Sequence, residues 1–283
     1  MDSPPFRRIG PGVPQTPVVI AVAHAGRVYP PALAAAARVA VDRLVGLEDR
    51  HVDQMTAAAV DDGATVIVAD IARAWIDLNR SPDEVDGTMI DPPWPATASH
   101  DGPRIRAGLG LVPRRIAGVG EIWHGRITAA DLAARIAAAH APYHRAIGDA
   151  LAAARAAHGV AVLLDLHSMP PLSGMDRGVG VVVGDLNGTS AGAAVTSGAI
   201  DAARAAGYRV SRNRPYAGGY GVACHGAPTC GVHAVQIELC RSLYLDAALR
   251  SPGPGFARTQ RFVAMLRHAL ASVVTHNQAA AAE

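Results

Sequence analysis

Two histidines follow apolar runs that are typical of buried strands, which makes them the first residues to consider for chemistry. His24 comes directly after residues 18–23, and His167 ends the run that begins at Leu163 and is followed by Ser-Met-Pro. A strand that ends in histidine presents an imidazole at the rim of a sheet, where open α/β folds bind ligands. A single histidine of this kind is more often a hydrogen-bonded structural residue. Two of them, beside an acidic pair, favour a metal site.

The acidic pair supplies a third ligand. A catalytic zinc ion needs three protein ligands from nitrogen and carboxylate donors and an open fourth position for water. His24 and His167 provide two of these ligands, and the natural third is an acid in the segment 46–53, where Glu48 and Asp49 stand side by side. The pattern alone leaves open which acid binds.

Glu238 is the candidate for the general base that a metal site needs in order to cleave an amide. It lies in a strand-like run in which Val235, Ile237 and Leu239 alternate with two polar residues. A solvent-facing acid in a surface ion pair is the alternative. Both faces of a central strand in an α/β sheet are usually covered, so a charged glutamate there needs a partner or a function.

Asn79 and Arg80 follow another strand-like run, 74–78, and are suited to bind a carboxylate. Arginine can give two parallel charge-assisted hydrogen bonds, and asparagine adds a further donor. Asp77 could orient Arg80 or the loop that follows. An equally good alternative is a structural Arg–Asp pair that holds this long loop in place.

Two further arginines lie in loop-like sequence. Arg126 precedes the helical stretch 128–157, and Arg214 lies in the segment 213–220, whose two glycines suit either a ligand or a tight turn. On local grounds a solvated arginine explains Arg126, and turn chemistry explains the glycines. The loop 184–190 could hold an anion ahead of a helix, but an N-cap with turn residues is the preferred interpretation.

The cysteines suggest a different metal site, which the spacing disfavours. Cys224, His225, Cys230 and His233 form a compact set, but structural zinc usually takes paired ligands at short regular spacing. The chain has three cysteines in all, an odd number without a Cys-x-x-Cys motif, which argues against a disulfide scaffold. We therefore expect reduced thiols.

The composition excludes several classes of function. The chain of 283 residues contains no lysine, so it can form neither a lysine Schiff base nor a Gly-Lys-Ser/Thr phosphate loop. A net charge of +2 with scattered arginines argues against nucleic acid and anionic membranes as partners. No apolar stretch reaches the roughly 18 to 20 residues of a membrane span. We expect a globular protein of the cytoplasm.

The elements that must position these residues alternate along the chain. Strands are predicted at 18–23, 65–70, 74–78, 160–166, 179–184, 208–212 and 233–240, and helices at 128–157, 190–206 and 256–276. The alternation favours a mainly parallel or mixed sheet sandwiched between helices. The segment 81–120, rich in proline and glycine, is predicted to be a long loop excursion from a single domain.

These motifs resemble those of the N-formylglutamate amidohydrolase family, and the resemblance runs from His24 to Tyr244. Nine blocks occur in the family's order: His24-Ala-Gly-Arg with Tyr29-Pro30, Glu48-Asp49 with Val52-Asp53, Ile76 to Arg80, Gly125-Arg126, Pro142-Tyr143-His144, Asp165 to Pro170, Gly184-Asp185 with Gly188 to Ser190, Asn213 to Gly219, and Gly231 to Glu238 through Arg241 and Tyr244. The order of the blocks carries the resemblance, because no single block is decisive.

The family is similar to zinc carboxypeptidases and aspartoacylases. This similarity implies an α/β protein with a three-layer α/β/α sandwich, a mixed and mostly parallel central sheet, and one catalytic zinc ion (Zn2+). Carried over to this sequence, it makes His24, Asp49 and His167 the metal ligands, with Asp49 preferred over Glu48. Carboxypeptidases place two ligands in one His-x-x-Glu turn, but the fourth residue here is Arg27, so the third ligand must come from elsewhere.

The same resemblance implies the remaining roles. Glu238 would be the base, and Asn79 with Arg80 would grip a substrate carboxylate. A dicarboxylate needs a second cationic anchor, for which Arg126 and Arg214 are both candidates, and the sequence does not choose between them.

The implied reaction is hydrolysis of a small anionic N-acyl amino acid. Most concretely, N-formyl-L-glutamate and water would give formate and L-glutamate, a step of histidine degradation. A zinc peptidase or deacylase of the same fold that acts on another substrate is the alternative, because fold does not fix function. A non-catalytic binding protein is disfavoured by the retained histidines and acids. The sequence does not indicate an oligomeric state.

Overall fold

A mixed seven-stranded sheet forms the centre of the computed structural model, which describes residues 4–94 and 102–282, with side chains up to residue 276. The strand order is β1-β3-β2-β8-β11-β9-β10. The bounds are β1 Phe6–Ile9, β2 Val18–Val22, β3 Thr65–Ala69, β8 Ala161–Met169, β9 Val181–Gly184, β10 Val210–Arg212 and β11 Val232–Cys240.

The three strands β2, β8 and β11 run parallel and carry the predicted site residues. Ala21 of β2 pairs with Asp165 of β8, and Glu238 of β11 pairs with His167. Every residue of β2 and β8 is buried, which explains why both strands are continuous apolar runs with few polar interruptions. The next strand, β9, runs antiparallel to β11, so the sheet is mixed.

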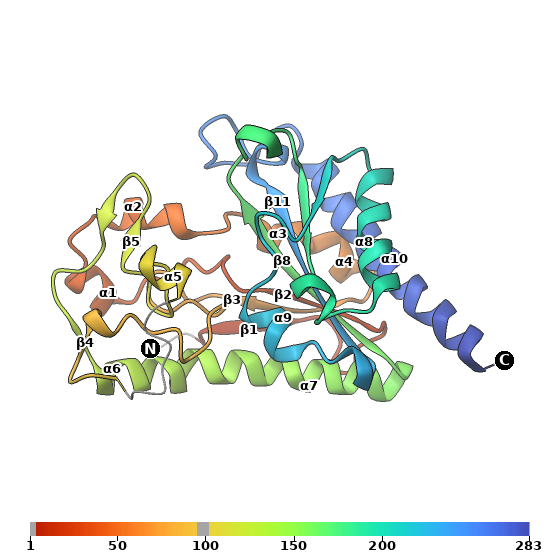
Figure 1. Ribbon diagram of the computed structural model, residues 1–283, viewed down its shortest axis with the longest axis horizontal. Coiled ribbons are helices and arrows are strands. Elements are labelled where there is room, and N and C mark those ends of the chain that lie inside the picture. Colours follow the sequence, from red (N-terminus) through yellow and green to blue (C-terminus); the bar gives the residue numbers. More distant parts are fainter. Residues whose placement is uncertain (1–3, 95–101, 283) are drawn as a thin grey trace. The chain divides into compact units, whose positions relative to one another are not determined.

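Helices cover both faces of this sheet. On one face, α8 (Ala193–Ala205) packs against α10 (Phe256–Ala282), which also contacts α3 (Val52–Met55), α4 (Ala57–Asp61), β2 and β8. Figure 1 shows α8 and α10 side by side, with α9 (Tyr220–His225) and the C-terminal part of α7 (Ala141–His158) on the other side of the strands. The three-layer α/β/α sandwich with a mixed, mostly parallel sheet is confirmed.

The long helix predicted at 128–157 is present in three parts. It comprises α6 (Ala129–Arg135), a π-helical turn (Ile136–His140) and α7. Thr128 caps its start, because the Thr128 hydroxyl accepts a hydrogen bond from the Asp131 backbone N–H at 3.0 Å. Of the other two predicted helices, α8 begins three residues later than predicted and α10 continues past residue 276.

Two strand predictions need correction. Residues 74–78 form no strand but a turn, in which the Asp77 carboxylate accepts the Asn79 backbone N–H at 2.9 Å and so replaces a strand hydrogen bond. Strand β8 does not end at His167 but continues to Met169, where pairing with Cys240 of β11 is the last before Pro170, which has no N–H to donate. The apolar pattern of 74–78 reflects burial inside a turn.

The contacts within the chain group it into two compact units. Unit 1 contains Met1–Arg7, Ala23–Glu48 and Val68–Arg145, and unit 2 contains Arg8–Val22, Asp49–Ile67 and Ala146–Glu283. Unit 2 holds most of the sheet with α3, α4, α8, α9 and α10. Unit 1 is built mainly from short elements: α1 Pro31–Ala36, α2 Val41–Leu44, η1 Val45–Leu47, η2 Gly87–Met89, β4 Ile90–Asp91, α5 Pro103–Arg106, β5 Arg115–Ile116, β6 Gly120–Glu121 and β7 Ile127–Thr128, followed by α6.

The segment 81–120 lies in unit 1 and is not a plain loop. It carries η2, β4, α5, β5 and β6, although residues 95–101 of the prediction lie outside the described residues. The prediction of a single domain over residues 1–283 stays a prediction. Across the described part of the chain, no helix combines the length and the apolar character that crossing a membrane requires.

Candidate active site

His167 lies near the carboxyl end of β8, the central strand of the sheet, between two carboxylates. Its Nε2 is 3.1 Å from Oδ1 of Asp165, and its Nδ1 is 3.1 Å from Oδ2 of Asp49. Asp165 precedes His167 by two residues in β8, so both side chains leave the strand on the same face. The nine-residue strand therefore fixes the histidine and one of its carboxylate partners together.

The two carboxylates determine the charge of His167. Burial disfavours the protonated imidazole, but Asp165 and Asp49 outweigh that effect and raise the pKa of His167 well above its ordinary value. Both ring nitrogens face acceptors, so the imidazole donates at both positions when no metal is bound. The position between Nδ1 and Asp49 is therefore one that attracts a positive charge.

Two donors besides His167 hold Asp49, the neutral hydroxyl of Ser168 and the cationic guanidinium of Arg241. Oδ1 of Asp49 accepts a hydrogen bond from the Ser168 hydroxyl at 3.0 Å and from Nη2 of Arg241 at 3.2 Å. Arg241 Nε also donates to the Ser168 hydroxyl oxygen, at 3.1 Å. These bonds fix the carboxylate so that Oδ2 faces His167.

The pair of Asp49 and His167 fits two ligands of one metal ion. With zinc–ligand bonds of about 2.1 Å and a tetrahedral angle, two ligand atoms lie about 3.4 Å apart. The distance between His167 Nδ1 and Asp49 Oδ2 is 3.1 Å. The second nitrogen of a metal-binding histidine usually donates to a carboxylate, which is the role that Asp165 has here.

Glu238 occupies the same level of the neighbouring strand as His167. The two residues are directly paired between the parallel strands β11 and β8, so their side chains leave the sheet on one face. Glu238 is 9% exposed, and one of its carboxylate oxygens, Oε1, accepts a hydrogen bond from Nε2 of Gln236 at 2.8 Å. A buried carboxylate is therefore present beside the His167 position.

His24 lies in unit 1 and also donates to an aspartate. Its Nε2 is 2.6 Å from Oδ1 of the fully buried Asp77. The segment after His24 lies directly against the backbone at Ile71, since a Cβ on Gly26 would come within 1.9 Å of the Ile71 carbonyl oxygen. Only glycine permits this close approach.

Asp77 organises the turn that contains Asn79 and Arg80. Its Oδ2 accepts from Nε of Arg73 at 2.8 Å and lies 3.8 Å from Nη2 of Arg80. Burial would raise the pKa of Asp77, but the guanidinium groups of Arg73 and Arg80 hold it well below its usual value. Asp77 was predicted to orient Arg80, but Arg80 is only one of several residues that its carboxylate contacts. The shortest of these contacts is the one to His24.

Asn79 and Arg80 are both buried in this turn. The Arg80 guanidinium donates from Nε to the Leu109 carbonyl and from Nη1 to the Asn79 carbonyl, both at 2.8 Å. Desolvation lowers the pKa of Arg80, and the neighbouring Asp77 opposes that effect. The guanidinium is thus fixed by backbone acceptors in unit 1.

Glu48 has a different partner from Asp49. The Tyr29 hydroxyl donates a hydrogen bond to the Glu48 carboxylate, and both residues belong to unit 1. Asp49, in contrast, faces His167 within unit 2. This difference supports the choice of Asp49.

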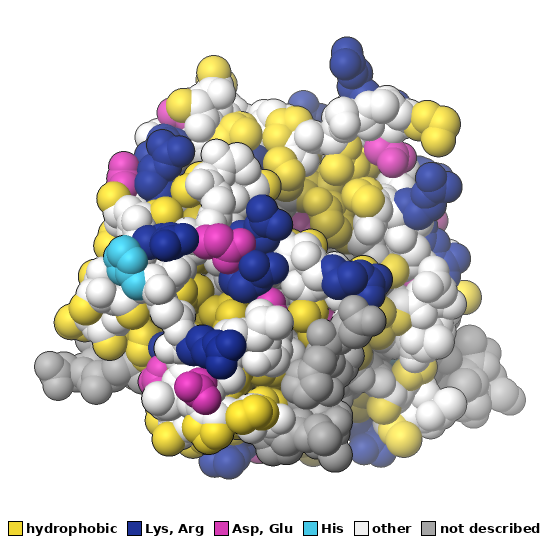
Figure 2. Space-filling view, turned by 60° about the vertical axis from the view of Figure 1, so that its left-hand side comes forward, with side chains coloured by type: hydrophobic (Ala, Val, Ile, Leu, Met, Phe, Trp, Pro, Cys, Tyr) yellow, Lys and Arg dark blue, Asp and Glu magenta, His cyan; other side chains and the backbone are white. Residues whose placement is uncertain are grey.

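The two candidate anchors for a second carboxylate are both exposed. Arg126 lines a hollow in unit 1 together with Arg38, Arg114 and Trp123, whereas Arg214 lies in the loop after β10 in unit 2. Figure 2 brings forward the side that carries α1, α5 and β5, and arginine side chains lie beside acidic ones there. Among the described residues, no buried partner is seen to hold either arginine in the way that Arg80 is held.

The alternative metal set of Cys224, His225, Cys230 and His233 does not assemble. No three of these four residues offer ligand atoms within 4.8 Å of one another in the part of the chain that the structure describes. His233 instead accepts the Gly192 backbone N–H at 3.1 Å. Cys224 and Cys230 are exposed free thiols.

The loop 184–190 uses turn chemistry, as preferred from the sequence. Asp185 accepts the Gly188 backbone N–H at 3.0 Å and caps the short helix η5 (Leu186–Gly188). The hydroxyl of Thr196 and the guanidinium of Arg212 also donate to this carboxylate, at 2.8 and 2.7 Å. The buried Asp185 is therefore satisfied within the protein.

Three contributors to the site were missed from the sequence. Asp165 could have been found, because an Asp-x-His pattern in a strand puts both side chains on one face. Ser168 and Arg241 hold Asp49 from positions more than a hundred residues away, and no local signal connects them.

The comparisons with known proteins point to one family. Its sequence profile, N-formylglutamate amidohydrolase, matches residues 16–245. The N-formylglutamate deformylase of Pseudomonas aeruginosa is 30% identical over 241 residues, which cover 82% of this chain and 83% of the relative. That of Pseudomonas putida is 28% identical over 207 residues and covers 70% of each chain.

Solved structures agree with the sequence comparisons. The crystal structure of N-formylglutamate amidohydrolase from Ralstonia eutropha JMP134 matches with a TM-score of 0.88 and 32% identity, over 96% of this chain and 99% of that one. A gene product of Agrobacterium tumefaciens shares the fold, with a TM-score of 0.67 at 18% identity over 98% and 97% of the two chains. By its sequence and its fold, the chain belongs to the N-formylglutamate amidohydrolase family.

Proposed function

We propose that this protein is a zinc-dependent amidohydrolase that converts N-formyl-L-glutamate and water to formate and L-glutamate. The observation that carries the proposal is His167, which lies between Asp49 at one ring nitrogen and Asp165 at the other. The names of the Pseudomonas and Ralstonia relatives supply the substrate. A place in histidine degradation and in the cytoplasm stays a prediction.

His24, Asp49 and His167 are the proposed zinc ligands. They are all buried and offer two imidazoles and one carboxylate, a donor set typical of catalytic zinc. In both histidines Nε2 faces an aspartate, which designates Nδ1 as the ring nitrogen for the metal.

The strand register supports the inclusion of His24. Ala21 of β2 pairs with Asp165 of β8, so the two strands run level as they approach their carboxyl ends. His24 follows Ala21 by three residues, and His167 follows Asp165 by two. Parallel strands in neighbouring positions deliver such residues to the same edge of a sheet.

Glu238 is the proposed general base. Zinc, when bound, supplies a Lewis acid for the formyl carbonyl and lowers the pKa of the attacking water to about 7. A carboxylate oxygen of Glu238 takes a proton from that water and passes it to the amine nitrogen of the departing glutamate. Its pairing with His167 supports this role, because the two side chains leave the sheet on the same face.

The substrate carboxylates would be bound by Asn79 and Arg80, with Arg126 or Arg214 as the second anchor. Burial strengthens a charge-assisted hydrogen bond from Arg80, because little water competes for the carboxylate. Asp77 is the hydrogen-bond partner of His24, and the turn that it organises fixes Asn79 and Arg80 directly after it.

A substrate panel tests the proposed reaction. Formate release from N-formyl-L-glutamate would be compared with product release from N-acetyl amino acids and short peptides, after zinc loading. We expect kcat/KM for N-formyl-L-glutamate to be at least about tenfold higher than for the other substrates, because one polar group can discriminate by that much. A preference for an acetylated substrate or a peptide would instead support a deacylase or peptidase of the same fold.

Glu238→Gln tests the base. We expect the variant to keep its zinc and to lose about 10²–10⁴-fold in kcat, the range usually assigned to a positioned base. The control is Asp201→Asn, which removes an exposed acid of α8. Near-normal turnover in Glu238→Gln, with zinc retained, would refute the assignment.

A further inference from the structure

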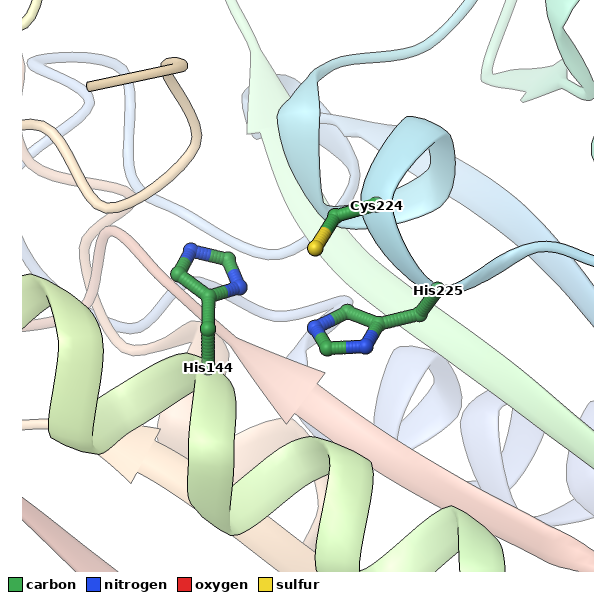
Figure 3. Close-up of side chains that lie close together, drawn as sticks. All are labelled: His144, Cys224 and His225. Atoms are coloured by element: carbon green, nitrogen blue, oxygen red, sulfur yellow. The ribbon is translucent and has the colours of Figure 1, made fainter.

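Two buried histidines that the proposed chemistry does not use lie one helical turn apart. His140 ends the π-helical turn and His144 lies in the first turn of α7. Figure 3 shows His144 projecting from α7 and also labels Cys224 and His225 of α9. The rings of His140 and His144 lie with their centres 4.5 Å apart.

Both imidazoles donate to the turn that carries Asn79 and Arg80. His144 Nε2 lies 2.7 Å from the carbonyl oxygen of Leu78, and His140 Nε2 lies 2.8 Å from the carbonyl oxygen of Arg80. A carbonyl oxygen can only accept, so each histidine carries its proton on Nε2. The two bonds bracket Asn79 from either side.

Burial keeps His140 in the form that this contact requires. Desolvation lowers the pKa of His140, and the hydrogen bond to the Arg80 carbonyl only partly opposes it. The ring is therefore neutral near pH 7, and no extra positive charge faces the Arg80 guanidinium.

The same turn is held from its inner side by Asp77. The Asp77 carboxylate accepts the Asn79 backbone N–H at 2.9 Å, and the Arg80 backbone N–H donates to the Asp77 carbonyl at 3.2 Å. The backbone donors of the turn thus point to Asp77, while two of its carbonyl oxygens point to the helix. Turns without a strand ladder depend on such individual hydrogen bonds for their conformation.

The π-helical turn explains how both histidines reach these carbonyls. A π-helical turn contains one residue more than an α-helical turn and shifts the side chains that follow it around the helix. Here it lies directly before α7 and includes His140 as its last residue. Such turns occur frequently at functional sites.

We propose that His140 and His144 are positioning residues that hold the 77–80 turn in the conformation in which Asn79 and Arg80 bind the substrate carboxylate. This inference rests on the proposed function for the identity of the substrate. The contacts themselves lie within unit 1 and do not depend on it.

The variants separate the hydrogen bonds from the bulk of the rings. His140→Phe and His144→Phe keep a buried ring but remove the donor, whereas His140→Gln and His144→Gln keep a donor near the position of Nε2. The matched control is His158→Phe. His158 lies on the same helix and donates from the same atom to a backbone carbonyl, that of Pro14 at 3.0 Å, away from the turn.

We expect each Phe variant to raise the KM for N-formyl-L-glutamate about tenfold, because a buried carbonyl loses its partner and the turn shifts. The Gln variants should restore most of this loss, and His158→Phe should leave KM unchanged. A Phe variant that melts at a lower temperature but keeps a normal KM would reduce the two histidines to a structural role and overturn the proposal.

Hydrogen exchange provides the readout that does not need turnover. The amide protons of Asn79 and Arg80 should exchange at least about tenfold faster in the Phe variants and at the wild-type rate in His158→Phe. Unchanged exchange would overturn the proposal whatever the kinetics. If the wild-type protein releases no formate from N-formyl-L-glutamate, the proposed function fails, and accelerated exchange would still show that the histidines hold the turn.

Discussion

Two histidine–aspartate pairs with the same chemistry are held in very different ways. In the strand pair, His167 and Asp165 both belong to β8, and their Nε2–Oδ1 distance is 3.1 Å. In the turn pair, His24 and Asp77 come from irregular backbone far apart in the sequence, and their Nε2–Oδ1 distance is 2.6 Å. Because each aspartate accepts a hydrogen bond from Nε2 of its histidine, Nδ1 is the ring nitrogen proposed to bind the metal.

The difference lies in what fixes the backbone. In the strand pair, backbone hydrogen bonds fix the positions of His167 and Asp165, because β2 and β11 pair with β8 on its two sides. The turn pair has no such ladder and relies on Arg73, on the Asn79 N–H and on the two helix histidines. The geometry of a central strand therefore tolerates the loss of a single side chain better than the geometry of the turn.

Removal of a proposed ligand histidine is the largest expected effect, and it should be the same for the two pairs. His167→Ala and His24→Ala should each release the metal, because two remaining ligands bind zinc far more weakly than three. Zinc content after dialysis, measured by mass spectrometry, should fall to background, and formate release with it. Stoichiometric zinc in either purified variant would remove that histidine from the ligand set.

Replacement of the aspartates breaks the similarity between the pairs. Asp165→Asn and Asp77→Asn should each weaken zinc binding about 10–100-fold, the usual effect of losing the carboxylate behind a ligand histidine. Asp77→Asn should also destabilise the fold more than Asp165→Asn does, by about 3–5 kcal/mol, because two guanidinium groups lose the buried carboxylate between them.

The measurements for this pair of variants are zinc affinity by competition with a chelator, KM, and unfolding in urea. Asp77→Asn should raise KM as well, since the carboxylate also holds the Asn79 N–H. Equal urea midpoints and equal KM values in the two variants would contradict the distinction between strand and turn.

The sequence predicted the strand that carries His167 better than the turn that carries Asp77, for a physical reason. A buried strand is visible in its apolar run or two-residue periodicity, so strands holding His167 and Glu238 could be inferred, although Asp165 was missed as the partner of His167. Residues 74–78 have the same apolar character, yet an aspartate that bonds the backbone two residues on turns the chain there. The contacts that hold Asp77 and Asn79 come from distant segments, and periodicity carries no information about them.

The arginines follow the same rule. The sequence made Arg80 a candidate carboxylate ligand on chemical grounds, but it did not predict that the guanidinium donates to the carbonyls of Asn79 and Leu109. The sequence also left open whether Arg126 or Arg214 is the second anchor. Both side chains are exposed, but Arg126 belongs to unit 1, with the turn pair, and Arg214 to unit 2, with the strand pair.

The smallest expected effect decides which of the two regions supplies the second anchor. Arg126→Gln or Arg214→Gln, but only one of them, should raise the KM for N-formyl-L-glutamate about fivefold. An exposed charged hydrogen bond contributes about 1 kcal/mol, less than a buried one. The same variant should leave the KM for N-formyl-alanine unchanged, because that substrate has no second carboxylate, and this selectivity separates an anchor from a general loss of activity.

If only Arg126→Gln has this effect, the second anchor belongs to unit 1, like Asn79 and Arg80. If only Arg214→Gln has it, the second anchor belongs to unit 2. If both variants keep the wild-type KM for N-formyl-L-glutamate, neither arginine is the anchor, and the turn with Asn79 and Arg80 is left as the main source of affinity. In that case we expect residues of the turn to select the substrate, while the paired strands β8 and β11 hold His167 and the proposed base Glu238.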